Sequence, residues 1–132
     1  MDTQAFYTLS YGLYIVSSVF EGKQNGCTVN TVTQVTSQPP KLSVAVNKQN
    51  LTAELIDKSG IFNAVSLTQD ATMETIGLFG FREGRTMDKY AKIPFAVDSN
   101  GINYPTETAA AQRPCKRADL THAGTHMIPI CV

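Results

Sequence analysis

The segment from residue 25 to residue 40 constrains the fold more than any other part of the chain. It reads NGCTVNTVTQVTSQPP, and β-branched residues such as Val and Thr favour strands. Its valines recur at every third position, so strict alternation fails and we expect a bulge or bend. The Asn25-Gly26 pair favours a tight hairpin turn before it. Pro39-Pro40 ends the strand, because proline has no amide hydrogen for the ladder.

Other short segments indicate a mainly β domain of the α+β kind. Strands are expected over residues 11–20, 41–47, 61–67 and 93–97, and short helices over residues 2–10, 50–58 and 71–79. Asn50 is expected to cap its helix at the N-terminus and Gly60 to close it. Antiparallel strands with two or three short helices between them predict a small barrel or sandwich.

Length and charge narrow the function classes. The 132 residues suit one domain over residues 1–132. Eleven basic side chains balance eleven acidic ones, which argues against nucleic-acid binding through bulk electrostatics. No apolar run approaches the roughly 20 residues needed to span a bilayer. The opening residues lack the basic start of a secretory signal. We therefore expect a cytoplasmic protein with no membrane or nucleic-acid partner.

Cysteine and histidine usage gives weak signals. The three cysteines are an odd number without a Cys-x-x-Cys pair, which favours a reducing compartment over a secreted disulfide framework. Cys115, His122, His126 and Cys131 lie near the C-terminus. Residues four apart in a strand stand roughly 13 Å apart, too far to share one ion. No metal site is predicted.

Two segments are suited to ligand binding. The polar strand of residues 27–37 is either a surface that presents hydroxyl and amide groups to a planar ligand or a solvent-facing strand, and its expected bend favours the first interpretation slightly. The glycine-punctuated loop around Arg82 and Arg85 is suited to phosphate, because guanidinium groups match phosphate oxygens. From sequence alone, a solvated loop with ion pairs to Glu83 and Asp88 is the simpler interpretation.

Several of these segments together resemble a known family. YGLYIVSS, NGCTVNTVTQVTSQPPKLSVAVNKQNLTAELI, GIFNAVSL and IGLFGFREGRTMDKY are similar to the flavin reductase-like family of FMN-binding split barrels, which includes small NAD(P)H:FMN oxidoreductases, flavoredoxins and the flavin domain of high-molecular-weight rubredoxins. The pattern T-x-N-T-x-x-Q-V-T-x-x-P-P, from Thr28 to Pro40, is its most specific part. The resemblance covers residues 9–97 closely and implies an FMN-binding split β-barrel of antiparallel strands, in a homodimer with the flavin near the subunit interface.

The resemblance also implies a set of site residues. Those expected beside the flavin ring are Thr28, Val29, Asn30 and Thr31; those expected along the ribityl and phosphate side are Gln34, Val35, Thr36 and Ser37; and further contacts are Asn47, Lys48, Arg82 and Arg85. His126, in Gly124-Thr125-His126, is implied near the nicotinamide or flavin, with a structural histidine as the alternative. Pro129 interrupts the strand expected after it, and residues 112–117 are more polar than the family's strand there.

The function implied is that of an FMN-dependent oxidoreductase, which passes reducing equivalents from NADH or NADPH through flavin to a flavin or redox-protein acceptor. A non-enzymatic FMN-binding electron carrier, working with a rubredoxin or flavodiiron partner, is the alternative. A member that binds no flavin is a third possibility. Family barrels usually continue beyond the Gly-x-His strand, so the resemblance implies that the chain is truncated after Val132 or that a dimer partner covers the exposed edge.

Overall fold

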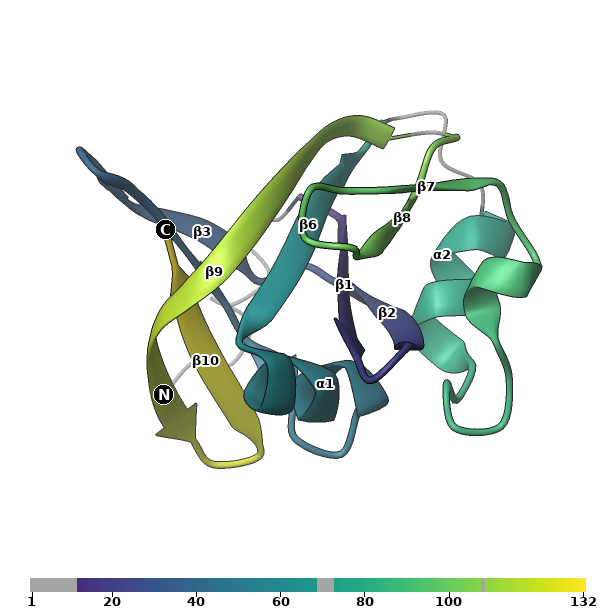
Figure 1. Cartoon of the computed structure of the whole chain (residues 1–132), viewed down its shortest axis with the longest axis horizontal. Coiled ribbons are helices and arrows are strands. Elements are labelled where there is room, and N and C mark those ends of the chain that lie inside the picture. The colour runs from purple at the N-terminus through teal and green to yellow at the C-terminus, as the bar shows by residue number, and fades with distance from the viewer. Residues whose placement is uncertain (1–11, 69–72, 108) are drawn as a thin grey trace, which may run out of the picture.

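The computed structural model describes residues 12–68, 73–107 and 109–132, and the predicted helix over residues 2–10 lies outside them (Figure 1). The elements, in chain order, are β1 (Tyr14–Phe20), β2 (Lys23–Val29), β3 (Val32–Ser37), β4 (Pro40–Val44), β5 (Val46–Asn47), α1 (Leu51–Ser59), β6 (Ile61–Leu67), α2 (Met73–Phe81), the 3-10 helix η2 (Lys89–Ala91), β7 (Phe95–Val97), β8 (Asn103–Pro105), β9 (Ala109–Ala123) and β10 (His126–Cys131).

One antiparallel sheet forms most of the molecule, in the order β2-β1-β6-β9-β10-β4-β3, with β5 also paired to β10. Its two end strands, β2 and β3, follow each other in the chain through Asn30 and Thr31 but are not hydrogen-bonded neighbours. The sheet therefore curls back on itself and leaves a seam, as in the split barrel that the sequence predicted. In Figure 1, α1 lies across the lower end of the strands and α2 stands beside β2, while β7 and β8 form a separate ribbon.

The main core lies between the curled sheet and α1. Ile56 of α1 and Phe62 of β6 are fully buried there with Val16, Val44 and Met127. Full burial of an apolar side chain of this size contributes roughly 1.5–3 kcal/mol. The caps of α1 are confirmed. The Asn50 side chain accepts a hydrogen bond from the Thr52 N–H, and Gly60 ends the helix in the left-handed region at φ 73°.

The hairpin turn predicted at Asn25-Gly26 was wrong. The β1–β2 turn lies at Glu21 and Gly22, whose φ angles are 49° and 80°, and residues 25 and 26 lie within β2. A Cβ on Gly26 would stand 2.6 Å from the Ser17 hydroxyl oxygen. The glycine thus permits a close approach between neighbouring strands instead of a turn.

The bend predicted in the polar strand is confirmed. The chain leaves β2 after Val29 and enters β3 at Val32, and the pairing of β3 with β4 shifts register between Gln34 and Thr36. The break at Pro39 is also present, since β3 ends at Ser37 before the cis Gln38–Pro39 bond. Pro40, however, begins β4.

The C-terminal strands correct two expectations. Residues 112–117 are part of β9, and β10 continues through Pro129, which is buried opposite Leu120. β10 pairs with β5 at residues 126–127 and with β4 at residues 130–131. Pro129 stands in the gap between those two pairings, so a missing amide hydrogen is tolerated on that side.

The cysteines differ from the expectation of reduced thiols. Cys115 of β9 and Cys131 of β10 are joined by a disulfide, and Cys27 is a buried free thiol. An odd number of cysteines does not exclude a disulfide between two of them. Within the described part of the chain, no cluster of three or more potential metal ligands is found. Among the same residues, no helix is both long and apolar enough to cross a lipid bilayer.

Candidate functional site

A cavity of about 190 Å³ brings together residues from four separate segments of the chain. It is bounded by the end of β2 with the following link, by β5 with the residue that caps α1, by Gly80 of α2 (Met73–Phe81), and by the start of β10. The predicted site residues among its walls are Thr28, Val29, Asn30, Thr31, Asn47 and His126, and the other lining residues are Cys27, Ala45, Val46, Asn50 and Gly80. Six of the thirteen predicted site residues therefore line one cavity.

A larger cavity of about 490 Å³ adjoins the first one. The two share Asn30, Thr31 and Ala45 as lining residues, so the β2–β3 link forms the boundary between them. The Thr31 hydroxyl donates a hydrogen bond to the Ala45 carbonyl at 2.8 Å and fixes this link against the β4–β5 segment. Asn30 is exposed, and its amide offers both a donor and an acceptor to a ligand.

Two predicted residues already have structural contacts. The Thr28 hydroxyl donates to the Ile76 carbonyl at 2.9 Å and attaches α2 to β2. Val29 packs against the main core. A Cβ on Gly80 would meet Thr28 at 3.5 Å, so α2 lies close to the cavity wall. What Thr28 and Val29 offer to a ligand is therefore mainly their backbone and their shape.

His126 and Asn47 face each other across the β5–β10 pair. The Thr125 hydroxyl lies 2.8 Å from His126 Nδ1, which fixes the ring and leaves Nε2 for a ligand. Asn47 Oδ1 accepts a hydrogen bond from the Gln49 N–H at 2.9 Å. The Lys48 N–H donates to the Thr125 carbonyl at 2.9 Å. Lys48 thus ties the two segments together through its backbone and is not part of the cavity wall.

The residues expected along the ribityl and phosphate side do not join this cavity. They lie on β3, which is exposed along most of its length and pairs only with β4. Val35 is 51% exposed, and the Thr36 hydroxyl donates to the Pro39 carbonyl. Gln34 lines a different cavity, and Ser37 is exposed at the end of the strand. Within one chain, β3 carries these side chains away from the site.

The basic loop is anchored beside the cavity. Arg85 Nη2 lies 2.8 Å from Glu54 Oε2, and its Nη1 donates to the Gln49 carbonyl at 3.0 Å and lies 3.3 Å from Glu83 Oε1. Hydrogen bonds from Lys58 and Arg85 hold the pKa of Glu54 below its usual range. The predicted ion pair with Glu83 is present. The Asp88 carboxylate instead accepts from the Tyr90 N–H.

Arg82 follows the end of α2 and is exposed. Gln49 and Asn50 adjoin each other in the chain, so the Arg85 contacts place the loop next to the α1 cap that lines the cavity. A phosphate role for Arg82 and Arg85 stays a prediction.

A buried polar cluster lies next to the cavity wall, at Gly26, which precedes the wall residue Cys27. Lys89 is 1% exposed, and its ammonium donates to the Gly26 carbonyl at 2.8 Å and to the Phe79 carbonyl at 3.1 Å. Burial lowers the pKa of Lys89 and raises that of Tyr90, whose hydroxyl is hydrogen-bonded to Ser17. Burial also raises the pKa of Cys27 to about 11. At neutral pH the Cys27 thiol in the cavity wall is therefore protonated and a poor nucleophile.

Sequence reasoning missed Cys27, Asn50 and Gly80 as cavity residues. The sequence did predict Asn50 as the N-cap of α1. A residue that caps a helix next to the end of a strand also borders the space between that helix and that strand. Cys27 and Gly80 carried no signal of their own, since only the packing of α2 against β2 brings them there.

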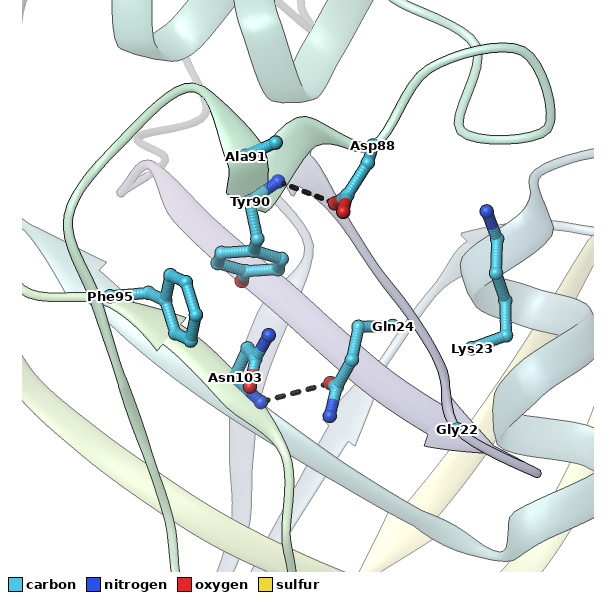
Figure 2. Close-up of a pocket in the computed structure, with 8 residues that line it drawn as sticks. All are labelled: Gly22, Lys23, Gln24, Asp88, Tyr90, Ala91, Phe95 and Asn103. Atoms are coloured by element: carbon cyan, nitrogen blue, oxygen red, sulfur yellow. Dashed lines mark hydrogen bonds between the residues drawn. The ribbon is translucent and has the colours of Figure 1, made fainter.

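Another cavity of about 190 Å³ lies between β2, η2 and the β7–β8 ribbon and contains none of the predicted site residues (Figure 2). Figure 2 shows the rings of Tyr90 and Phe95 on one side and the side chains of Gln24 and Asn103 on the other. The Asn103 N–H donates to Gln24 Oε1 at 3.0 Å. This hollow is separate from the candidate site.

Comparisons with known proteins agree with the geometry. A family model described as "Flavin reductase like domain" matches residues 6–131. A high molecular weight rubredoxin of Moorella thermoacetica is 41% identical over 128 residues, which cover 97% of this chain and 56% of that protein. A ferric-chelate reductase (NAD(P)H) of Archaeoglobus fulgidus is 38% identical over 128 residues, covering 97% of this chain and 76% of that protein. The chain thus spans little more than half the length of the rubredoxin relative.

Solved structures share the fold. A flavoredoxin from Methanosarcina acetivorans superposes with a TM-score of 0.82 at 19% identity, covering 92% of this chain and 64% of that one. An NADH:FAD oxidoreductase of Streptomyces globisporus gives a TM-score of 0.86 at 19% identity, covering 96% of this chain and 75% of that one. At these identities the likeness supports the arrangement of strands and helices alone.

Proposed function

Because the chain belongs to the flavin reductase-like domain family, we propose that residues 1–132 act as one FMN-binding domain that passes reducing equivalents from NADH or NADPH through the flavin to a flavin or redox-protein acceptor. The observation that carries the proposal is the convergence of Thr28–Thr31, Asn47 and His126 on one cavity. These segments are far apart in the sequence, and the fold alone brings them together.

The residues present fit a flavin. The larger of the two adjoining cavities, about 490 Å³, is of the size of an ordinary ligand pocket, which holds about 300–1,000 Å³. The smaller one, about 190 Å³, extends it past the β2–β3 link. The β2–β3 link lies outside the strand ladder at Asn30 and Thr31, so backbone N–H groups there are suited to the polar edge of a planar ring. The flavin, when bound, supplies the electron and hydride chemistry.

The protein groups have distinct roles in this proposal. Backbone N–H groups of the β2–β3 link and the Asn30 amide stabilise negative charge on the reduced ring, because fixed donors cost little reorganisation. His126 holds or releases a proton at Nε2, since its Nδ1 is engaged by Thr125. Asn47 and the α1 cap orient the bound molecule. Arg82 and Arg85 neutralise a cofactor phosphate beside α1. Arg85 does so by leaving one of its carboxylate partners and contacting the phosphate instead.

The proposed partners and cellular location also rest on the family to which the chain belongs. The rubredoxin relative, of which the chain spans 56%, supports a redox protein as acceptor, of the rubredoxin or flavodiiron kind. A homodimer is proposed as the working form, with β3 and its residues Gln34–Ser37 near the subunit interface. The proposed location is the cytoplasm, where NADH and NADPH are available.

The test is a visible spectrum of the purified protein, followed by steady-state oxidation of NADH and of NADPH with FMN present. Flavin absorption bands together with nucleotide oxidation support the reductase. Flavin bands with no turnover of either nucleotide, but rapid electron exchange with a reduced rubredoxin, support the electron-carrier alternative. A colourless protein whose melting temperature does not respond to excess FMN contradicts both, because a ligand that binds the native state stabilises it.

The basic loop gives a more local test. Replacing Arg82 and Arg85 together with alanine is expected to weaken FMN binding by about 10-fold or more, since two charge-assisted contacts are removed, while the melting temperature changes little because both side chains are exposed. Arg117→Ala is the matched control, because Arg117 pairs with Asp57 at 3.5 Å on the other end of α1. An unchanged FMN affinity in the double variant shows that the loop is only solvated.

A further inference from the structure

The cavity that Gln34 lines, of about 300 Å³, has the Cys115–Cys131 pair in its wall. We propose that this bond is a reversible thiol–disulfide exchange site, at which small thiols that carry a carboxylate enter the cavity and open or close the bond. The site is separate from the proposed flavin site, and the proposal does not depend on flavin chemistry.

The fold places the two sulfurs together without making the cysteines cross-strand partners. Cys115 lies opposite Phe62 of β6, whereas Cys131 lies opposite Arg117 of β9. The register shift between Ile130 and Cys131 brings their Cα atoms to 5.4 Å, within the range of about 4.4–6.8 Å that a disulfide needs. The bond therefore links β9 to the end of β10 and forms without backbone movement.

The cavity gives the bond a route to small molecules. Cys115 and Cys131 are 3% and 1% exposed, so large reagents do not reach them from the surface. Both nevertheless line the cavity, whose walls include Leu42, Pro114 and the side chain of Gln34. A bond in a closed core is inert. This one is inert only to reagents larger than the cavity.

The charge around Cys115 selects the reagent. Residues 113–117 read RPCKR. Lys116 is exposed on the other face of the strand and Arg117 pairs with Asp57, which leaves Arg113 as the cationic side chain on the cavity side. Arg113 lines the cavity, and its Nη1 donates to the Ser66 hydroxyl at 2.7 Å, so its guanidinium group is held in place. The described side chains that line the cavity include no carboxylate, and the only anionic group there is the α-carboxylate of Val132, the last residue of the chain as given. Cationic neighbours stabilise a thiolate and attract an anionic reagent.

The exchange balances in two displacements. A small thiolate attacks one sulfur of the pair, the sulfur–sulfur bond breaks, and the other cysteine leaves as a thiolate. The product is a mixed disulfide between the protein and the small thiol. A second small thiolate then attacks the outer sulfur of that mixed disulfide, the bond to the protein sulfur breaks, and the first cysteine leaves as a thiolate while the oxidised small disulfide is released. Two electrons pass to the cysteine pair, and the oxidised small disulfide drives the reverse reaction.

The test uses the native protein in buffers of reduced and oxidised glutathione. Samples are quenched in acid, unfolded, alkylated with N-ethylmaleimide and weighed by mass spectrometry. We expect one alkylated cysteine, Cys27, in the oxidised buffer and three in excess reduced glutathione, with the change complete under native conditions. Three alkylated cysteines in the oxidised buffer, or reduction no faster than global unfolding, would overturn the proposal.

Charge selection is tested separately with two thiols. Glutathione carries carboxylates and 2-mercaptoethanol carries none. Arg113→Gln is expected to slow reduction by glutathione about threefold to tenfold, as loss of one charge-assisted contact does, and to leave reduction by 2-mercaptoethanol unchanged. Cys27→Ser is the control and should alter neither rate. In the wild-type protein, added salt should slow glutathione more than 2-mercaptoethanol. Equal effects on both thiols would overturn the selection for carboxylates.

Discussion

Replacing Gly84 with alanine is expected to destabilise the protein strongly. Gly84 lies in the loop that carries Arg82 and Arg85 and is buried against Asn25 of β2. A Cβ at this position would stand 2.5 Å from Asn25 Cγ and 2.7 Å from its Nδ2. Asn25 does not move aside easily, because it is 1% exposed and its Nδ2 donates to the Thr52 hydroxyl at 2.9 Å. Either the loop lifts or that hydrogen bond breaks.

The magnitude follows from these two contacts. Overpacking a filled core costs about 1–3 kcal/mol, and losing a buried hydrogen bond adds about 1 kcal/mol. We expect the free energy of unfolding to fall by about 2–4 kcal/mol, which lowers the melting temperature of a chain of this size by roughly 10 °C. Thermal unfolding followed by circular dichroism measures the change.

Gly77→Ala provides the matched control. Gly77 lies inside α2, and a Cβ there would meet only the Phe81 ring at 3.4 Å. Alanine is favoured over glycine inside a helix by roughly 0.5–1 kcal/mol, so this variant should melt slightly above the wild type. A Gly84→Ala variant that melts within about 1 °C of wild type would refute the close packing of the loop on Asn25.

Three further predictions concern the neighbourhood of the site. Lys89→Met removes both charge-assisted bonds of the buried ammonium and should lower the free energy of unfolding by about 2 kcal/mol; an unchanged midpoint in urea contradicts this. Asn50→Ala should cost about 1 kcal/mol through loss of the α1 cap, whereas Asn50→Asp, which keeps the cap, should cost much less in the same assay. Burial raises the pKa of the Cys27 thiol to about 11, whereas its pKa in the unfolded chain is about 8.5. The protonated thiol therefore contributes to the free energy of unfolding in full below about pH 8.5, and this contribution is lost as the pH rises through 11. Native Cys27 that alkylates at pH 9 as fast as the unfolded chain would rule this out.

The elements that the sequence predicts well are those with a strong local signal. α1 has an Asn cap, a Gly stop and a buried face, and β6 (Ile61–Leu67) is a short, mostly apolar segment that contains Ile61, Phe62 and Val65, which favour strands. The Asn25-Gly26 turn failed for a tertiary reason. The same dipeptide that suits a hairpin also suits a strand where Ser17 and Phe79 press close to the backbone, and only the packed fold distinguishes the two.

β9 and β10 show why polar strands are hard to assign. Within residues 112–117 only Cys115 is buried, and both of its neighbours in the chain, Pro114 and Lys116, are exposed. Such a segment carries too few apolar residues to show alternation, and its strand partners β6 and β10 supply the hydrogen bonds that its composition does not predict. The disulfide was also missed, because the distance between Cys115 and Cys131 depends on a register shift in the pairing of β9 with β10, and composition does not show such a shift.

About half of the candidate site was accessible from the sequence. The T-x-N-T motif and the Gly-Thr-His motif named residues that share one cavity, because each motif sits at a strand end that the barrel brings to the same place. The residues on β3, Gln34 to Ser37, were implied by the family resemblance, and their role stays a prediction. The bend at Asn30 and Thr31 sends β3 out to pair with β4 only, and spacing along a chain does not show on which side of a bend the chain continues.

The position of β10 in the sheet has a consequence for biosynthesis. This strand lies between β9 and the β4–β5 segment, and its residues pair with Leu42, Ser43, Val46 and Asn47 from the first half of the chain. Chains grow from the N-terminus, and a domain generally folds as a unit once it has emerged from the ribosome. Until β10 emerges, β4 lacks one neighbour and His126 is absent from the cavity. The cavity proposed as the cofactor site is therefore incomplete until β10 takes its place in the sheet.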